Sequence, residues 1–182
     1  ANSSKEDLGF DKLKFPPEKA IYISLLKQSG IHKLNKKLGY FELSIPPKNS
    51  NLHDLWVISE QFLSSALSNK KNLSELYDIL LNQPYKLKKG FVDFWIPIFL
   101  ISKKEDYALF YKNGNYIPFL QEDTLDLIYK KPEDYIIKSY DVSGLKLNLL
   151  ESYKELVQIT DSNSKGIQST FLSIFGNFLR FQ

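Results

Sequence analysis

The stretch Ala108–Phe119, ALFYKNGNYIPF, decides the fold that this sequence predicts. Two runs of apolar and aromatic residues flank the dipeptide Asn113-Gly114. Such a dipeptide between β-prone runs is the strongest short-range signal for a tight hairpin turn, because both residues adopt positive φ readily. We therefore predict a β-hairpin at this position.

A capped helix precedes the hairpin, in the stretch NLSELYDILLN. Asn72 and Glu75 form a capping-box-like pattern, in which the Asn side chain accepts an orphan backbone N–H and the acid in the first turn suits the helix dipole. We predict the helix over Leu73–Asn82, and Pro84 ends it. The stretch PYKLKKG is then a turn.

Between that turn and the hairpin lies Phe91–Ser102, which is apolar nearly all round apart from Asp93. We predict a helix that belongs to a core or an interface, with a kink or a break at Pro97. Helix, turn, helix and hairpin follow one another in the order of a winged helix, a fold often used to bind DNA. The predicted fold class is α+β and mostly helical, with a winged-helix-like unit (helix-turn-helix plus β-hairpin) over residues 72–141 and additional flanking helices.

The part before this unit divides in two. Residues 1–14 are predicted to be a disordered terminus or a non-native remnant. Residues 15–71 are predicted to be an N-terminal helical part, with helices in PEKAIYISLLKQSG and from Asn51 onward and a strand in YFELSI. The stretch IHKLNKKLG is ambiguous, and one interpretation is a second short helix closed by Gly39.

After the hairpin we predict a helix over Glu122–Lys130 and a third strand in DYIIKSYDV. Residues 142–182 are predicted to be C-terminal helices. The last of them, in TFLSIFGNFLRFQ, still has apolar residues arriving at helical spacing where the sequence stops. Such a face would have nothing to cover it, so we expect a truncated helix and a fragment of a longer protein.

The composition excludes several classes of protein. The 182 residues include no Cys, so disulfides and thiolate metal sites are excluded. The longest apolar run, Phe94–Ile101, is too short to span a bilayer, and the N-terminus has no apolar signal region. We expect a cytoplasmic location and no membrane partner.

Motifs for catalysis and for cofactors are missing from the sequence. No phosphate-binding glycine pattern is present, because the eight glycines are scattered singly. The two histidines, His32 and His53, lie on different predicted elements, and their spacing matches no zinc site. We therefore predict that this chain is not an enzyme and binds no cofactor or metal.

The distribution of charge bears on whether the hairpin binds DNA. Residues 70–104 carry seven lysines against three acids, whereas acidic residues bracket the hairpin on both sides. Arg180 is the one arginine, which leaves the chain poorly equipped for specific contacts to guanine. The candidate nucleic-acid contacts are lysines at the turn and at the hairpin tip: Lys86, Lys88, Lys89 and Lys112. The alternative that we favour for the turn lysines is a solvated helix end.

Two tyrosines, Tyr111 and Tyr116, flank the hairpin turn. Exposed aromatic side chains among lysines can stack on the bases of single-stranded nucleic acid. Cross-strand aromatic side chains more often simply stabilise a hairpin, by about 0.2–1 kcal/mol per pair. We favour the structural role.

The stretch LYDILLNQPYKLKKGFVDFWIPIFLISKKEDYALFYKNGNYIPFL resembles a segment in the C-terminal half of large, uncharacterised bacterial P-loop ATP-binding proteins. In that family a pattern like PPYGLK-x-G leads into an apolar helix and then ALY-x-x-G-x-F-x-P. The matching residues here are Pro84, Tyr85, Leu87, Lys88, Gly90, Ala108, Leu109, Phe110, Gly114, Tyr116 and Pro118, and Lys86 stands where the pattern favours Gly. The resemblance implies part of a larger ATPase whose ATP-binding motif lies elsewhere, and it implies no reaction for this segment.

From these observations we expect a non-catalytic structural or protein-interaction domain. Its partners would be other domains of the same protein or a second copy. The aromatic residues of the apolar helix, Phe94, Trp95 and Phe99, are expected in the core, and Phe175, Phe178 and Phe181 at an interface. The alternative is a weak, sequence-tolerant DNA- or RNA-binding winged-helix module, whose affinity would fall steeply with salt.

Overall fold

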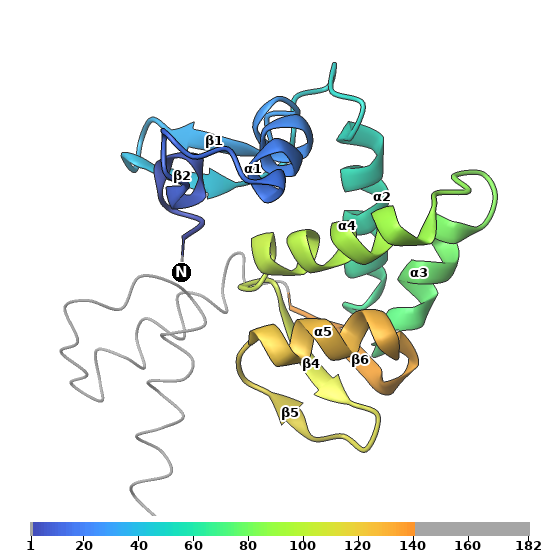
Figure 1. The fold of residues 1–182 in the computed structure, drawn as a ribbon. Coiled ribbons are helices and arrows are strands. Elements are labelled where there is room, and N and C mark those ends of the chain that lie inside the picture. The colour runs from blue at the N-terminus through green and yellow to red at the C-terminus, as the bar shows by residue number, and fades with distance from the viewer. Residues whose placement is uncertain (1, 141–182) are drawn as a thin grey trace, which may run out of the picture. The chain divides into compact units, whose positions relative to one another are not determined.

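The computed structural model describes residues 2–140, whose elements are drawn in Figure 1. The helices expected over residues 142–182, and the interface expected at Phe175, Phe178 and Phe181, lie outside the described residues. The described residues form two compact units, one of residues 2–64 and 88–102 and the other of residues 65–87 and 103–140. Both contain helices and an antiparallel sheet, so the fold class is α+β, as predicted.

The first unit combines a short β-hairpin with helices. Its elements are η1 (Glu6–Gly9), α1 (Pro17–Tyr22), the π-helical turn η2 (Ile23–Lys27), β1 (His32–Asn35), β2 (Tyr40–Leu43), α2 (His53–Ser65) and α4 (Lys89–Ser102). Pro17 opens α1 at a position where the missing N–H costs no hydrogen bond. The predicted helices of this unit are confirmed, as is the strand in YFELSI.

The interpretation of IHKLNKKLG as a short helix is wrong, because β1 pairs with β2 in an antiparallel hairpin that places Asn35 opposite Tyr40. The Asn35 side chain accepts the backbone N–H groups of Lys37 and Leu38 at 3.0 and 3.2 Å. Such local side-chain hydrogen bonds compete with helix formation and favour a turn. Gly39, with φ +74°, closes this loop.

Aromatic packing between α2 and α4 forms the core of the first unit. The Trp56 ring meets Trp95 and Phe99 edge to face, with ring centroids 6.1 and 5.6 Å apart, and all three side chains are buried. The Trp95 indole N–H donates to the Ser59 hydroxyl at 3.0 Å. α4 runs unbroken through Pro97, so of the kink or break predicted there the break is absent. The predicted core role of Trp95 and Phe99 is confirmed, whereas Phe94, also expected in the core, is only partly buried.

The second unit contains a four-stranded sheet. Its elements are β3 (Lys71–Asn72), α3 (Leu73–Leu81), β4 (Tyr107–Tyr111), β5 (Tyr116–Ile117), α5 (Glu122–Lys130), the 3-10 turn η3 (Pro132–Asp134) and β6 (Tyr135–Ser139). Asn72 caps α3 as predicted: its side chain accepts the Ser74 N–H at 2.9 Å, and Glu75 accepts the Asn72 N–H at 3.0 Å. The helix over Glu122–Lys130 and the third strand are also confirmed.

The third strand, β6, lies in the middle of this sheet, whose order is β3-β6-β4-β5 with every neighbouring pair antiparallel. β3 and β4 are therefore parallel on either side of β6, and β5 and β6 are parallel on either side of β4. α3 lies in the first of these connections and α5 in the second (Figure 1). Right-handed crossovers place both helices on the same face of the sheet, and both helices contact η3.

The hairpin of β4 and β5 is tight, as predicted, but its loop has three residues. The Gly114 N–H donates to the Tyr111 carbonyl, and the Tyr111 N–H to the Asn115 carbonyl, both at 2.8 Å. Gly114 has φ +90°, whereas Asn113 keeps a negative φ and accepts the Asn115 N–H on its side chain. This is the three-residue loop that needs glycine at its last position.

Burial alternates along β6 and distinguishes the two faces of the sheet. Tyr135, Ile137 and Ser139 are buried on the face against which α3 packs, while Ile136 and Lys138 are only partly buried. We call the second face the outer sheet face. Strand register and ring contacts place on it Lys70, Phe110, Tyr116, Ile136, Lys138 and Tyr140, together with their cross-strand neighbours Asn72, Asp106 and Ala108.

Candidate interaction surfaces

The predicted turn lysines are all exposed: Lys86 and Lys88 lie between α3 and α4, and Lys89 is the first residue of α4. The Lys89 ammonium donates to both carboxylate oxygens of Asp93, at 2.9 and 3.0 Å. Because this ion pair spans one helical turn, the charge of Lys89 is partly balanced within α4. Lys86 and Lys88 are therefore the better placed of the three to meet a phosphate.

The fourth candidate, Lys112, is exposed at the tip of the β4–β5 hairpin. The two tyrosines beside it point to opposite faces of the sheet. Tyr116 packs against Phe110 on the outer sheet face, at 5.6 Å between ring centroids, whereas Tyr111 packs against Tyr135 on the other face, at 5.5 Å. Tyr111 and Tyr116 therefore do not form one stacking platform. The pair of Tyr116 and Phe110 stabilises the hairpin, and the pair of Tyr111 and Tyr135 stabilises the pairing of β4 with β6.

The outer sheet face is a surface that the sequence analysis missed. Tyr116 is 45% exposed and Tyr140 48% exposed, and Phe110 and Ile136, which lie in one cross-strand row with Tyr116, are partly exposed. Burial raises the pKa of Tyr140 above its ordinary value, and Tyr116 adds to this shift. The alternation of residues 136, 138 and 140 in YIIKSY was the signal that could have revealed this face.

Both cations of the outer sheet face are bound by groups of the protein itself. The Lys70 ammonium lies 4.4 Å from the centroid of the Phe110 ring, which is a cation–π contact. The Lys138 ammonium donates to the carbonyls of Leu67 and Ser68 at 2.6 and 3.1 Å. This face therefore presents aromatic surface, and neutral groups of the protein hold its two ammonium groups in place.

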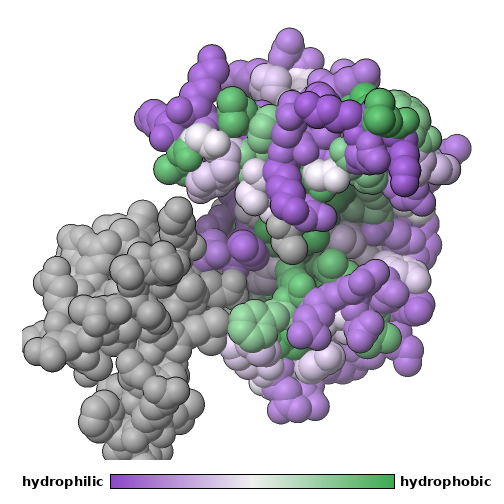
Figure 2. All heavy atoms as spheres, turned by 60° about the vertical axis from the view of Figure 1, so that its left-hand side comes forward, coloured by the Kyte–Doolittle hydropathy of each residue, from purple (hydrophilic) through white to green (hydrophobic). Residues whose placement is uncertain are grey.

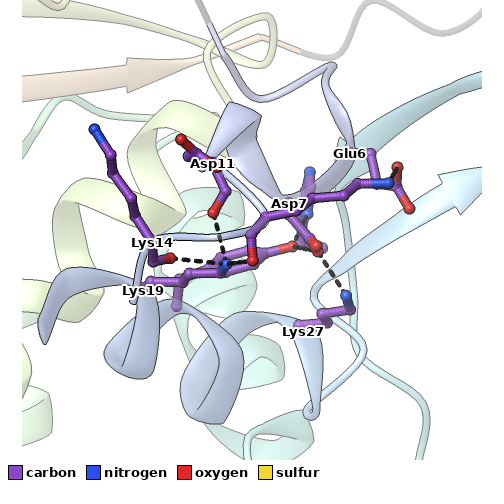
Figure 3. Close-up of polar contacts among 9 residues, drawn as sticks. Glu6, Asp7, Asp11, Lys14, Lys19 and Lys27 are labelled. Atoms are coloured by element: carbon purple, nitrogen blue, oxygen red, sulfur yellow. Dashed lines mark hydrogen bonds and ion pairs between the residues drawn. The ribbon is translucent and has the colours of Figure 1, made fainter. Parts of the chain in front are cut away.

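Residues 2–14, for which the sequence predicts a disordered terminus, are held by ordered contacts in the first unit. The buried Lys19 ammonium donates to the backbone carbonyls of Asp11, Lys12 and Lys14 at 2.8, 3.5 and 3.1 Å. Figure 3 shows this ammonium group between the carbonyls of Asp11 and Lys14. A lysine that must bury its charge needs such acceptors, and they fix the loop around it.

A second set of polar contacts holds η1. The Tyr22 hydroxyl lies 3.2 Å from Asp7 Oδ1 and 2.8 Å from His32 Nδ1, while His32 Nε2 lies 3.0 Å from the Ser3 carbonyl oxygen. The Lys27 ammonium donates to Asp7 Oδ1 at 2.6 Å (Figure 3), and this bond holds the pKa of Asp7 below its ordinary value of 3.8.

The backbone of η1 depends on these contacts. Asp7 and Leu8 have φ of +50° and +53°, in the left-handed region. That conformation costs a residue with a side chain roughly 1–2 kcal/mol, so it persists only where surrounding contacts impose it. The contacts through Tyr22, His32 and Lys27 are the ones that surround it here.

The described residues offer no metal site and no membrane span. Within residues 2–140, no group of three or more His, Asp or Glu side chains could hold a metal ion, and no helix is long and apolar enough to cross a bilayer. Hydrophobic residues reach the surface in several places among hydrophilic ones (Figure 2).

Comparisons with known proteins give no relative. No protein-family model, curated protein or solved structure matches the chain. The resemblance to bacterial ATP-binding proteins therefore rests on the sequence motif alone, and a function has to be argued from the geometry of the described residues.

Proposed function

We propose that this chain is a non-catalytic structural or protein-interaction domain, a fragment of a larger bacterial ATPase, and that it binds protein through the outer sheet face. The observation that carries the proposal is the pair Tyr116 and Tyr140, each close to half exposed on a sheet whose other face is covered by helices. The partner is another domain of the same protein or a second copy. A chain without cysteine suits the cytoplasm.

The side chains of the outer sheet face suit a protein interface. Tyr116 and Tyr140 offer large rings with a polar tip, a type enriched among the residues that carry most of the binding energy at interfaces. Phe110 and Ile136 supply apolar surface beside Tyr116. A sheet also holds these side chains on a rigid backbone, so little conformational entropy is lost on binding.

Electrostatics favours a protein over a nucleic acid at this face. Lys70 already binds the Phe110 ring, and Lys138 already donates to two backbone carbonyls. Across the described part of the second unit, nine lysines meet nine acidic residues, so the unit carries no net charge. Attraction to phosphates supplies most of the affinity of sequence-tolerant nucleic-acid binding, and here it is weak.

Oxidative footprinting of tyrosines tests this proposal. The reactivity of Tyr116 and Tyr140 is compared in the dilute chain, in the concentrated chain and in the larger ATPase. We expect both tyrosines to react several-fold more slowly in at least one of the last two. Tyr40 and Tyr111, which are 42% and 37% exposed elsewhere, are the matched controls and should keep their reactivity. Undiminished reactivity of Tyr116 and Tyr140 in all three samples would contradict the proposal.

A second candidate function is weak, sequence-tolerant binding of DNA or RNA, with contacts at Lys86, Lys88, Lys89 and Lys112. The observation in its favour is that all four lysines are exposed. Against it stand the ion pair between Lys89 and Asp93 and the neutral charge of the second unit. The two candidates differ in their response to salt, because only phosphate binding is strongly screened.

We propose further that α3, α4 and the β4–β5 hairpin are a winged-helix-like scaffold. They follow one another along the chain in that order. β6 pairs with β4 over residues 107–111 and so ties the hairpin into a larger sheet. A hairpin fixed in this way suits a scaffold better than a wing that adjusts to a DNA backbone.

A further inference from the structure

The contacts around His32 require more protons than the neutral side chains can supply. Three contacts run in series: the Ser3 carbonyl oxygen to His32 Nε2 at 3.0 Å, His32 Nδ1 to the Tyr22 hydroxyl at 2.8 Å, and that hydroxyl to Asp7 Oδ1 at 3.2 Å. Each needs one proton between its two atoms. A neutral imidazole and a phenol have two protons in total.

The positions of those protons are dictated by the acceptors at the two ends. A carbonyl oxygen only accepts, so Nε2 of His32 carries a proton that it donates to Ser3. With a neutral ring, Nδ1 then accepts the one Tyr22 proton, and nothing is left between Tyr22 and Asp7. One further proton, on Nδ1, fills all three contacts: Nδ1–H donates to the Tyr22 oxygen, and the Tyr22 hydroxyl donates to Asp7.

The other titratable groups of the series cannot supply this proton. Asp7 stays ionised because the Lys27 ammonium donates to it at 2.6 Å, which lowers the pKa of Asp7. The Tyr22 hydroxyl keeps its single proton because burial and the nearby Asp7 raise the pKa of Tyr22 far above its ordinary value. The third proton therefore belongs on His32.

We propose that Ser3, Asp7, Tyr22 and His32 form a proton-operated clasp, which fastens η1 and the residues before it to α1 and β1 when His32 is protonated and loosens when His32 is neutral. The groups that face His32 are the Tyr22 hydroxyl, the Ser3 carbonyl and the uncharged Phe41 ring, which is stacked at 5.2 Å. The charged groups nearby act on its partners: Asp7 and Glu6 act on Tyr22, and Lys27 and Lys19 act on Asp7.

The direction of the pH dependence follows from which state binds the proton. The three filled contacts hold one proton more than the neutral side chains supply, so closure is favoured at low pH and lost as pH rises. Asp7 acts in the opposite direction and in another range. Because its pKa is lowered, its contribution is present above 3.8 and is lost only in more acid solution.

Two NMR measurements on the whole chain test the clasp. Long-range nitrogen–proton spectra should show both His32 nitrogens protonated near pH 5.5 and Nε2–H alone near pH 8. The Phe41 N–H, which donates to the Ser4 carbonyl at 3.2 Å, reports closure through its exchange with solvent. Its protection, corrected for the intrinsic rate, should fall by up to roughly tenfold per pH unit over this range, the limit for one linked proton.

Variants and an internal control complete the test. Tyr22→Phe removes the central hydroxyl and should abolish most of the pH dependence of the Phe41 protection. His53, whose Nδ1 lies 2.9 Å from the Pro46 carbonyl, should instead show the Nδ1–H form when neutral. The proposal is overturned if His32 carries one proton at both pH values, or if Tyr22→Phe leaves the full pH dependence of protection in place.

Discussion

Replacing Trp95 by alanine is expected to lower the free energy of unfolding by about 3–5 kcal/mol, the usual cost of deleting a buried aromatic side chain. Trp95 is 1% exposed, its ring meets Trp56 edge to face, and its indole N–H donates to Ser59. The substitution leaves a cavity between α2 and α4 and removes one donor. Urea denaturation measures the loss, and Trp56, the other tryptophan of the chain, reports unfolding in the variant.

The neighbouring Phe94 provides the matched control. Phe94 is only partly buried on the same helix, so Phe94→Ala should cost about 1–2 kcal/mol. Equal and small losses for both variants would contradict the assignment of α4 as a core helix. Such losses would indicate instead that the aromatic side chains of α4 form a binding surface.

The replacement Ile137→Ala should destabilise the protein by about 2–5 kcal/mol. Ile137 lies on β6 in the middle of the sheet, opposite Leu109 on β4 and Lys71 on β3, and is fully buried. Its side chain packs on the face that α3 covers, so truncation leaves a cavity at the centre of the second unit. Thermal unfolding followed by circular dichroism measures the effect.

Ile136→Ala is the control, because it deletes the same atoms from the adjacent residue on the outer sheet face. Ile136 is partly exposed there, and its truncation should cost about 1 kcal/mol or less. If Ile136→Ala were as destabilising as Ile137→Ala, the outer sheet face would be a core surface and could not serve as the proposed binding surface.

Local signals in the sequence predicted much of this fold. Asn72 and Glu75, the capping pair, are only three residues apart in the sequence. Their hydrogen bonds involve only residues 72 to 75. The same holds for Gly114, whose positive φ is a local requirement of the hairpin loop. Several features that a few neighbouring residues determine were therefore predicted correctly.

Features that depend on distant partners were not predicted. The alternation of YIIKSY identifies β6 as a strand, but its place between β3 and β4 depends on pairing with residues far away in the chain. β1 is a strand because β2 pairs with it and because the Asn35 side chain turns the chain between them. IHKLNKKLG taken alone does not reveal that partner.

The candidate surfaces show the same division. Exposed lysines at a turn can be predicted from the sequence, and Lys86 and Lys88 are indeed exposed. The outer sheet face needs the register of four strands, since Tyr116 and Tyr140 share a face only through β4 and β6. The contacts of His32 with Tyr22 and Ser3 also join three separate segments, so no local sequence motif predicts them.

The central claim is that this chain binds protein and not nucleic acid. Fluorescence anisotropy of labelled duplex and single-stranded DNA, titrated with the chain at about 50 and 200 mM salt, tests it most directly. We predict no binding even at the lower salt, for the chain and for a variant in which Lys130 and Lys131 are replaced by alanine. The claim would be contradicted by micromolar binding at the lower salt that is lost at the higher salt. Such binding should also persist in the Lys130 and Lys131 control and disappear when Lys86, Lys88 and Lys89 are replaced by alanine.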